Sequence, residues 1–340
     1  MPRTVIGCGG ARGFKCFVCK GFRQNLSRTV RRLVLFGLAA LVAGLAWSGG
    51  AKARARDADD TGAKLTASVM NDPEARGGFQ LLYELKFDEA RKRFMKWEQE
   101  RPAEPSGPAM EAAADLFEEF YRKGVLTSDF FLDDKRLLGG IKGEPDADLE
   151  RQFAAAAERG QKMARARLEE QPTDPNALFA LTLIEGMQAD DLFLIQRRQI
   201  ESLHHLREAD RRARMLLEVA PDADDAYVAL GAANYIIGCL PGYKRAVLWV
   251  GGVRGDKTLG MQQVARAAAS EHAHYLRPFA RLLLALASLR EKNTDVARQQ
   301  LQDLVMEFPE NPLFAKELAK VTPVMTGVAP FGGPQSAPAR

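Results

Sequence analysis

The segment from Gly252 to Thr258 has the glycines, lysine and threonine of a phosphate-binding loop. Such a loop needs the pattern G-x-x-x-x-G-K-[ST], in which backbone N–H groups and the lysine surround the phosphate. Here Asp256 directly precedes Lys257 and would place a negative charge where the phosphate must lie. We therefore expect these residues to form a tight turn in which Asp256 caps the following helix.

Two clusters of histidine could support metal binding. Glu271, His272 and His274 form one, but histidines two residues apart point to different sides of a helix, and the H-E-x-x-H pattern is absent. His204 and His205 are adjacent and also point to different faces. The sequence thus predicts no metal site and no cofactor.

Residues that could form a catalytic centre are also missing. No G-x-S-x-G nucleophile motif occurs, and no histidine lies in a context typical of a catalytic triad. We interpret the paired carboxylates Asp190 and Asp191 as the acidic start of a helix, where they would complement the helix dipole. We predict a protein that is not an enzyme.

The first 56 residues differ in charge from the rest of the chain. They contain 11 Lys or Arg and no Asp or Glu, so the remaining residues contain 37 basic and 44 acidic side chains, a net charge of −7. The formal charge of +4 for the whole chain is therefore misleading. Because the body of the protein is acidic, we expect it to bind no nucleic acid.

The same segment has the features of a secretory signal peptide. Arg31 and Arg32 precede an apolar run at 33–47, and small residues follow, with cleavage sites that end at Ala53 or Ala55. We predict that residues 1–55 are removed and that the protein is periplasmic or secreted, with only transient membrane contact. The alternative is an uncleaved anchor in the inner membrane, although the run is shorter than the ~20 residues of a spanning helix.

Three of the four cysteines lie in this N-terminal segment. Cys16 and Cys19 form a single C-x-x-C with Cys8 outside it, so a zinc knuckle would lack a second ligand pair. Either an extended targeting segment or a translation start near Val30 would remove all three. Only Cys239 would remain, which permits no intramolecular disulfide.

A fixed spacing of small residues, apolar residues and proline recurs along the acidic body. It is the spacing of the second helix of a tetratricopeptide repeat, a unit of 34 residues with two helices. After one of the prolines, Tyr227-x-x-Leu230-Gly231 is close to the start of the first helix of such a repeat. The copies are Ala90, Phe94, Trp97 and Pro102; Ala209, Ala213, Leu216 and Pro221; Ala297, Leu301, Leu304 and Pro309; and a degraded copy, Gly160, Ala164, Arg167 and Pro172.

These copies predict an all-α, TPR-like superhelix of about four or five helix pairs over residues 71–322. A flexible lead-in at 56–70 would precede it, and the Gly/Pro-rich tail at 323–340 would be disordered. The distances between successive prolines exceed whole numbers of 34-residue repeats, and the excess residues form three insertions. In repeat proteins, insertions often lie on the binding face.

The first two insertions have specific structural expectations. Residues 125–148 would pack over the repeats through Phe130, Phe131 and Leu132, or act as a lid. The helix before them would begin with Ser106 as N-cap, and Asn293 or Thr294 would cap the helix that contains Ala297. The second insertion would lengthen the connection into one extended helix at 190–218, which contains His204 and His205.

The third insertion, residues 234–264, carries a resemblance. Its Leu240-Pro241, Gly255-Asp256 and Gly260 resemble the eukaryotic family of the inclusion-body clearance protein and the tetratricopeptide repeat 39 proteins. The chain without its leader is also similar to exported bacterial TPR proteins. The resemblance implies a superhelical interaction protein.

Aromatic and basic residues gather in this third insertion. Since Tyr, Trp and Arg are enriched in binding hot spots, we predict partner binding there; the alternative is that Tyr235 and Trp249 fill the core. The predicted residues are Tyr235, Tyr243, Lys244, Arg245, Trp249 and Arg254.

Two functions follow. The first is a non-catalytic exported scaffold that binds a protein or peptide, of unknown identity, in the cell envelope. The second is a periplasmic carrier of a small apolar ligand, associated with an envelope transporter. A peptide binder should have an open polar groove, whereas a carrier should have a closed apolar cavity.

Overall fold

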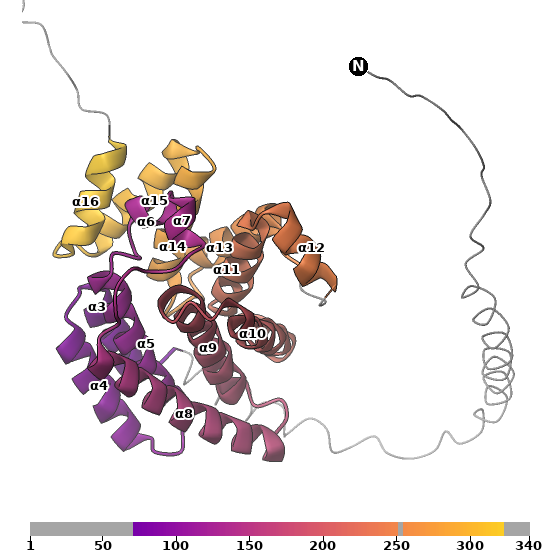
Figure 1. Cartoon of the computed structure of the whole chain (residues 1–340). Coiled ribbons are helices and arrows are strands. Elements are labelled where there is room, and N and C mark those ends of the chain that lie inside the picture. The colour runs from indigo at the N-terminus through magenta and orange to yellow at the C-terminus, as the bar shows by residue number, and fades with distance from the viewer. Residues whose placement is uncertain (1–70, 251–253, 323–340) are drawn as a thin grey trace, which may run out of the picture. The chain divides into compact units, whose positions relative to one another are not determined.

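The computed structural model describes residues 71–250 and 254–322, which belong to one compact unit (Figure 1). The predicted signal peptide, the alternative anchor at 33–47, the predicted lead-in at 56–70 and the predicted tail at 323–340 all lie outside the described residues. Within the described ranges, no helix combines the length and the apolar character that crossing a membrane requires.

The described part of the chain contains fourteen α-helices and no strand, so the all-α prediction is confirmed. One five-residue π-helical turn, η1, follows α9. The helices are α3 (Pro73–Tyr83), α4 (Phe87–Glu100), α5 (Ser106–Arg122), α6 (Ser128–Phe131), α7 (Asp134–Leu137), α8 (Ala147–Glu170), α9 (Pro175–Asp190), η1 (Asp191–Ile195), α10 (Gln199–Val219), α11 (Ala226–Cys239), α12 (Gly242–Val250), α13 (Lys257–Ala269), α14 (Arg277–Arg290), α15 (Thr294–Glu307) and α16 (Pro312–Val321).

The long helices pack against their neighbours in sequence order. The most extensive contacts join α3 with α4, α5 with α8, α9 with α10, α11 with α13, and α14 with α15. The spaced alanines lie at these contacts and are inaccessible to solvent, because a methyl group lets two helices approach closely; they are Ala90, Ala164, Ala213 and Ala297.

Each proline of the recurring spacing lies two residues beyond the end of its helix. The helices α4, α8, α10 and α15 end at positions 100, 170, 219 and 307, and the prolines follow at 102, 172, 221 and 309. Proline lacks the N–H that would continue the helix. The predicted ends of these four helices are therefore confirmed.

The contact between α11 and α13 depends on two glycines. A methyl group on Gly260 would lie 2.5 Å from the backbone nitrogen of Tyr235 and 2.8 Å from the carbonyl oxygen of Gly231. One on Gly231 would lie 2.8 Å from the nitrogen of Val264. Backbone atoms cannot rotate out of the way, so a side chain here must separate the helices.

We therefore expect Gly260→Ala to lower the free energy of unfolding by about 3 kcal/mol, the upper range for overpacking. Gly186→Ala is the matched control, because Gly186 lies inside α9 and an added methyl would meet no atom within 4 Å. That change should raise stability by up to about 1 kcal/mol. Urea unfolding measures both; equal stabilities for Gly260→Ala and wild type would contradict the close contact.

The first described helix pair is bonded to the last helices. The Tyr83 hydroxyl donates to the backbone oxygen of Tyr275 at 2.9 Å, and the Asn311 side chain donates to the backbone oxygen of Tyr83 at 2.7 Å. The ring of Phe79 stacks on Tyr275, with centroids 5.1 Å apart. These contacts join segments about two hundred residues apart, so α3 completes its core only against the C-terminal part of the chain.

The first insertion also packs against the C-terminal helices. The Ser128 N–H donates to Glu317 at 3.1 Å, and Arg290 donates to the backbone oxygen of Phe131 at 3.0 Å. Phe130 and Phe131 are buried as predicted, but Leu132 is half exposed. Leu132 follows α6 as its C-cap residue, which places it outside the packed face.

Two local predictions are wrong. Ser106 is not the N-cap of α5, because Pro105 already has helical dihedral angles and places Ser106 inside the first turn. The second insertion does not extend one helix: α9 passes into η1, and Arg197, with φ of 58°, breaks the chain direction before α10. The predicted caps Asp256 and Asn293 are confirmed, since their side chains accept the N–H groups of the helices that follow.

Candidate functional site

The six residues predicted to bind a partner do not form one site. Tyr235 is buried, its ring stacks on Phe131, and its hydroxyl lies 3.0 Å from Glu291. Its assignment to a binding surface is therefore wrong, and the alternative of a core position is confirmed. Burial follows from its place inside α11, where Phe131 covers the ring.

The other five residues lie on or beside α12. Tyr243 is 71% exposed and Trp249 is 59% exposed, so the alternative that Trp249 fills the core is wrong. Arg245 and Arg254 are also exposed, while Lys244 is partly buried. The Arg254 guanidinium lies 5.9 Å from the centroid of the Trp249 ring, within cation–π range.

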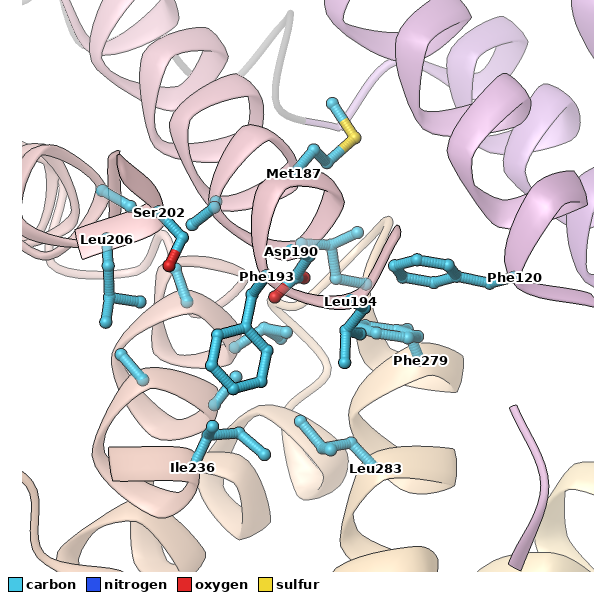
Figure 2. Close-up of a pocket in the computed structure, with 18 of the residues that line it drawn as sticks. Phe120, Met187, Asp190, Phe193, Leu194, Ser202, Leu206, Ile236, Phe279 and Leu283 are labelled. Carbon is cyan, nitrogen blue, oxygen red and sulfur yellow. The ribbon is translucent and has the colours of Figure 1, made fainter. Parts of the chain in front are cut away.

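The described residues line an apolar cavity of about 200 Å³, partly open to solvent, between the middle helices of the chain (Figure 2). Side chains of α5, α9, η1, α10, α11 and α14 form its walls, and the first insertion closes part of it. Representative apolar lining residues are Phe120, Phe131, Leu137, Met187, Phe193, Leu194, Leu206, Ile236, Phe279 and Leu283.

The first two insertions meet at this cavity. The N–H of Ile141, at the end of the first insertion, donates to the Leu194 carbonyl in η1 at 2.7 Å. A Cβ on Gly140, whose φ is 79°, would lie 2.5 Å from that same carbonyl oxygen. The contact of Gly140 and Ile141 with the Leu194 carbonyl holds η1 in place. Because of it, Phe193 and Leu194 lie against the cavity.

Most polar side chains around the cavity have their hydrogen bonds satisfied. Thr182 and Ser202 donate to carbonyl oxygens of Leu178 and Gln199, both at 2.8 Å. Asp225 accepts the backbone N–H groups that begin α14, that of Leu276 at 2.8 Å. Each of these groups already has a partner within the protein.

Asp190 is different. Its side chain is partly buried and lines the cavity. No other described residue gives its carboxylate a hydrogen bond or an ion pair. Figure 2 shows the carboxylate directed into the pocket beside Phe193 and Leu194.

The environment of Asp190 opposes its negative charge. Burial raises the pKa of the Asp190 carboxyl to about 7, and the neighbouring Asp191 contributes to the rise. Asp191 itself does not line this cavity, and its carboxylate accepts a hydrogen bond from Gln196 at 2.6 Å. The two adjacent carboxylates are therefore in different surroundings.

Our interpretation of Asp190 and Asp191 as the start of a helix is wrong. They lie where α9 ends and passes into η1, and the C-terminal end of a helix disfavours a negative charge. The sequence does contain an indication: apart from Gln188, the two aspartates are the polar residues in the stretch from Met187 to Ile195. Two charges inside such a stretch need a specific structural reason.

The histidine clusters have other partners. His205 Nδ1 lies 2.7 Å from Glu185, and the His204 ring packs edge-on against His205. His272 and His274 also lie edge-on, with centroids 6.3 Å apart. Across the ranges that the structure covers, no three His, Cys, Asp or Glu side chains lie close enough together to hold a metal ion.

Comparison with known proteins leaves the chain without an assigned family. No protein-family model matches it, and no curated protein matches its sequence. The resemblance of residues 234–264 to the tetratricopeptide repeat 39 family therefore stays a prediction. So does the similarity to exported bacterial TPR proteins.

Proposed function

We propose that this protein binds a small apolar molecule in the cavity between its middle helices. The observation that carries the proposal is the apolar cavity of about 200 Å³. A cavity of this kind, rather than an open polar groove, is what distinguishes a carrier from a peptide-binding scaffold. The carrier, the second function considered from the sequence, is thus the better supported.

The apolar walls of the cavity support the proposal, because covering apolar surface with an apolar ligand contributes about 25 cal/mol per Å² removed from water. An engineered cavity of ~150 Å³ binds benzene, which has six non-hydrogen atoms. In proportion to volume, this cavity has room for about eight non-hydrogen atoms.

The proposal places the cavity in an exported helical-repeat protein. The sequential helix pairs, the buried alanines and the prolines beyond four helices support a TPR-like architecture. The basic, apolar and small-residue order of the N-terminal segment supports export to the periplasm. A carrier that serves an envelope transporter is consistent with both, and neither requires catalysis.

A protein scaffold is the second candidate, and α12 favours it. Tyr243 and Trp249 are exposed large aromatic side chains on one short helix, with basic residues beside them. Aromatic and arginine side chains often dominate binding interfaces. This surface lies on a different helix from the walls of the cavity, so the two functions can be tested separately.

Filling the cavity tests the carrier function. Gly186 and Asp190 are four residues apart on the same face of α9, and both line the cavity. We expect Gly186→Leu to place its side chain in this space and to raise the free energy of unfolding by about 2–3 kcal/mol, from helix propensity and burial. The variant should no longer bind 1-heptanol, a probe of eight non-hydrogen atoms, in isothermal titration calorimetry.

The control for this experiment is Tyr243→Ala, which removes an exposed ring on α12 and leaves the cavity unchanged. It should bind 1-heptanol as wild type does. Saturable binding by Gly186→Leu with the wild-type affinity would contradict the proposal. Loss of probe binding in Tyr243→Ala alone would move the site to α12.

A further inference from the structure

Among the described residues that line the cavity, the carboxylate of Asp190 is the polar group left without a partner. The hydroxyl groups of Thr182 and Ser202 bond to their own helices, and Asp225 bonds to the start of α14. Asp190 therefore supplies the charged acceptor that is free to meet a polar atom of a ligand. A buried carboxylate that faces apolar walls costs free energy unless something pairs with it.

The charge around the cavity selects the kind of partner. The ionisable side chains among its lining residues are Asp190 and Asp225, both acidic, and Asp191 lies directly beside the first. No Lys, Arg or His belongs to the described residues that line the cavity. Such a site repels carboxylates and phosphates and attracts a cation.

We infer that the cavity takes an amphipathic organic cation, an apolar body of about eight non-hydrogen atoms that carries one amine, whose ammonium group donates hydrogen bonds to Asp190. The inference rests on the proposed function and specifies its ligand class. The apolar body fills the space beside Phe193, Met187 and Ile236, and the ammonium reaches the carboxylate at the end of α9. A metal ion does not fit, because the apolar walls offer no further oxygen ligands.

Three probes of the same length separate the alternatives. Heptylamine, 1-heptanol and heptanoate each contain seven carbon atoms and differ in charge, and calorimetry on the full chain at pH 8 measures each. We expect heptylamine to bind at least about tenfold more tightly than 1-heptanol, because a charge-assisted hydrogen bond is the stronger one. Heptanoate should bind more weakly than both.

Asp190→Asn tests the residue itself. We expect it to weaken heptylamine binding about tenfold or more and to change 1-heptanol binding less than twofold, which also shows that the variant is folded. Asp191→Asn is the matched control, since its carboxylate bonds to Gln196 and does not line the cavity. It should change heptylamine binding less than threefold.

The outcomes distinguish this inference from the proposed function. Equal affinities for heptylamine and 1-heptanol, both unaffected by Asp190→Asn, would overturn the inference and keep the apolar site. Tighter binding of 1-heptanol that depends on Asp190 would also overturn it, since the carboxyl would then act as a neutral donor. If none of the three probes binds, the proposed function falls and the inference with it.

Discussion

Replacing Arg91 by methionine is expected to lower the free energy of unfolding by about 3–5 kcal/mol, the cost of breaking a buried ion pair by removing one partner. Arg91 reaches from α4 to α5, where its Nε donates to Asp115 at 2.7 Å and its Nη2 pairs with Glu118. The side chains of Asp115 and Glu118 are only 4% and 8% exposed. Glu118 keeps Arg122 as a second partner, so Asp115 is the charge left unpaired.

Two opposing effects act on the pKa of Asp115: burial raises it, and the hydrogen bond and charge of Arg91 lower it. Removing Arg91 would leave burial unopposed. The charge can be removed in a second variant, Arg91→Met with Asp115→Asn, which should recover part of the lost stability. Arg151→Met is the surface control, because Arg151 and its partner Asp148 are both mostly exposed. That change should cost less than about 1 kcal/mol.

Urea unfolding measures all three variants. A loss in Arg91→Met no greater than in Arg151→Met would contradict the view that this pair holds α4 against α5. A double variant as unstable as the single one would show that lost packing of the arginine side chain, rather than the unpaired carboxylate, is responsible.

The second large effect is a dependence of stability on pH that Asp190 should cause. Its folded pKa of about 7 lies above its ordinary value of 3.8, so the native state binds more protons than the unfolded state between these values. The stability that the neutral carboxyl contributes is full below the ordinary value. It falls as the pH rises and is lost above about 7, in total about 4 kcal/mol.

Asp190→Asn isolates this contribution because asparagine does not titrate. The variant should gain about 3 kcal/mol relative to wild type between pH 4.5 and pH 8, measured by urea unfolding at both values. Other carboxyls with raised pKa values are present in both proteins and cancel in the difference; they are Glu111, Asp115, Asp191 and Asp225.

Ser202→Ala serves as the control for this measurement, since it removes a polar group that lines the cavity but carries no charge. Its difference from wild type should stay constant with pH. If the Asp190→Asn difference is also constant, the carboxyl of Asp190 is charged at both pH values, and its surroundings must stabilise the anion.

The helices could be predicted well because their determinants are local. The alanine spacing and the prolines act within one or two turns, so the sequence alone was enough to place four helix ends and two caps. The local errors arose where the backbone departs from regular geometry. Neither the π-helical turn at Asp191–Ile195 nor the left-handed conformation of Arg197 leaves a pattern that periodicity can detect.

The cavity could not be predicted because it is a tertiary feature. Its walls come from six helices and from insertions whose positions depend on contacts such as Ile141 with Leu194. Tyr235 and Trp249 show the same limit: both are aromatic residues of one insertion, yet one is buried and the other exposed. Their residue types indicated that either ring could bind a partner. The packing of α11 and α12 decides which ring is exposed to one.

The bond between Tyr83 and Asn311 has a consequence for synthesis. Its two residues are 228 positions apart, and a ribosome adds about 5–20 residues per second. Asn311 is therefore synthesised roughly 11–46 s after Tyr83. During that time the rings of Phe79 and Tyr83 lack the covering that Tyr275 and Phe308 later supply. The nascent chain therefore presents an aromatic surface that a chaperone can bind, and a chain truncated before Tyr275 should retain that surface permanently.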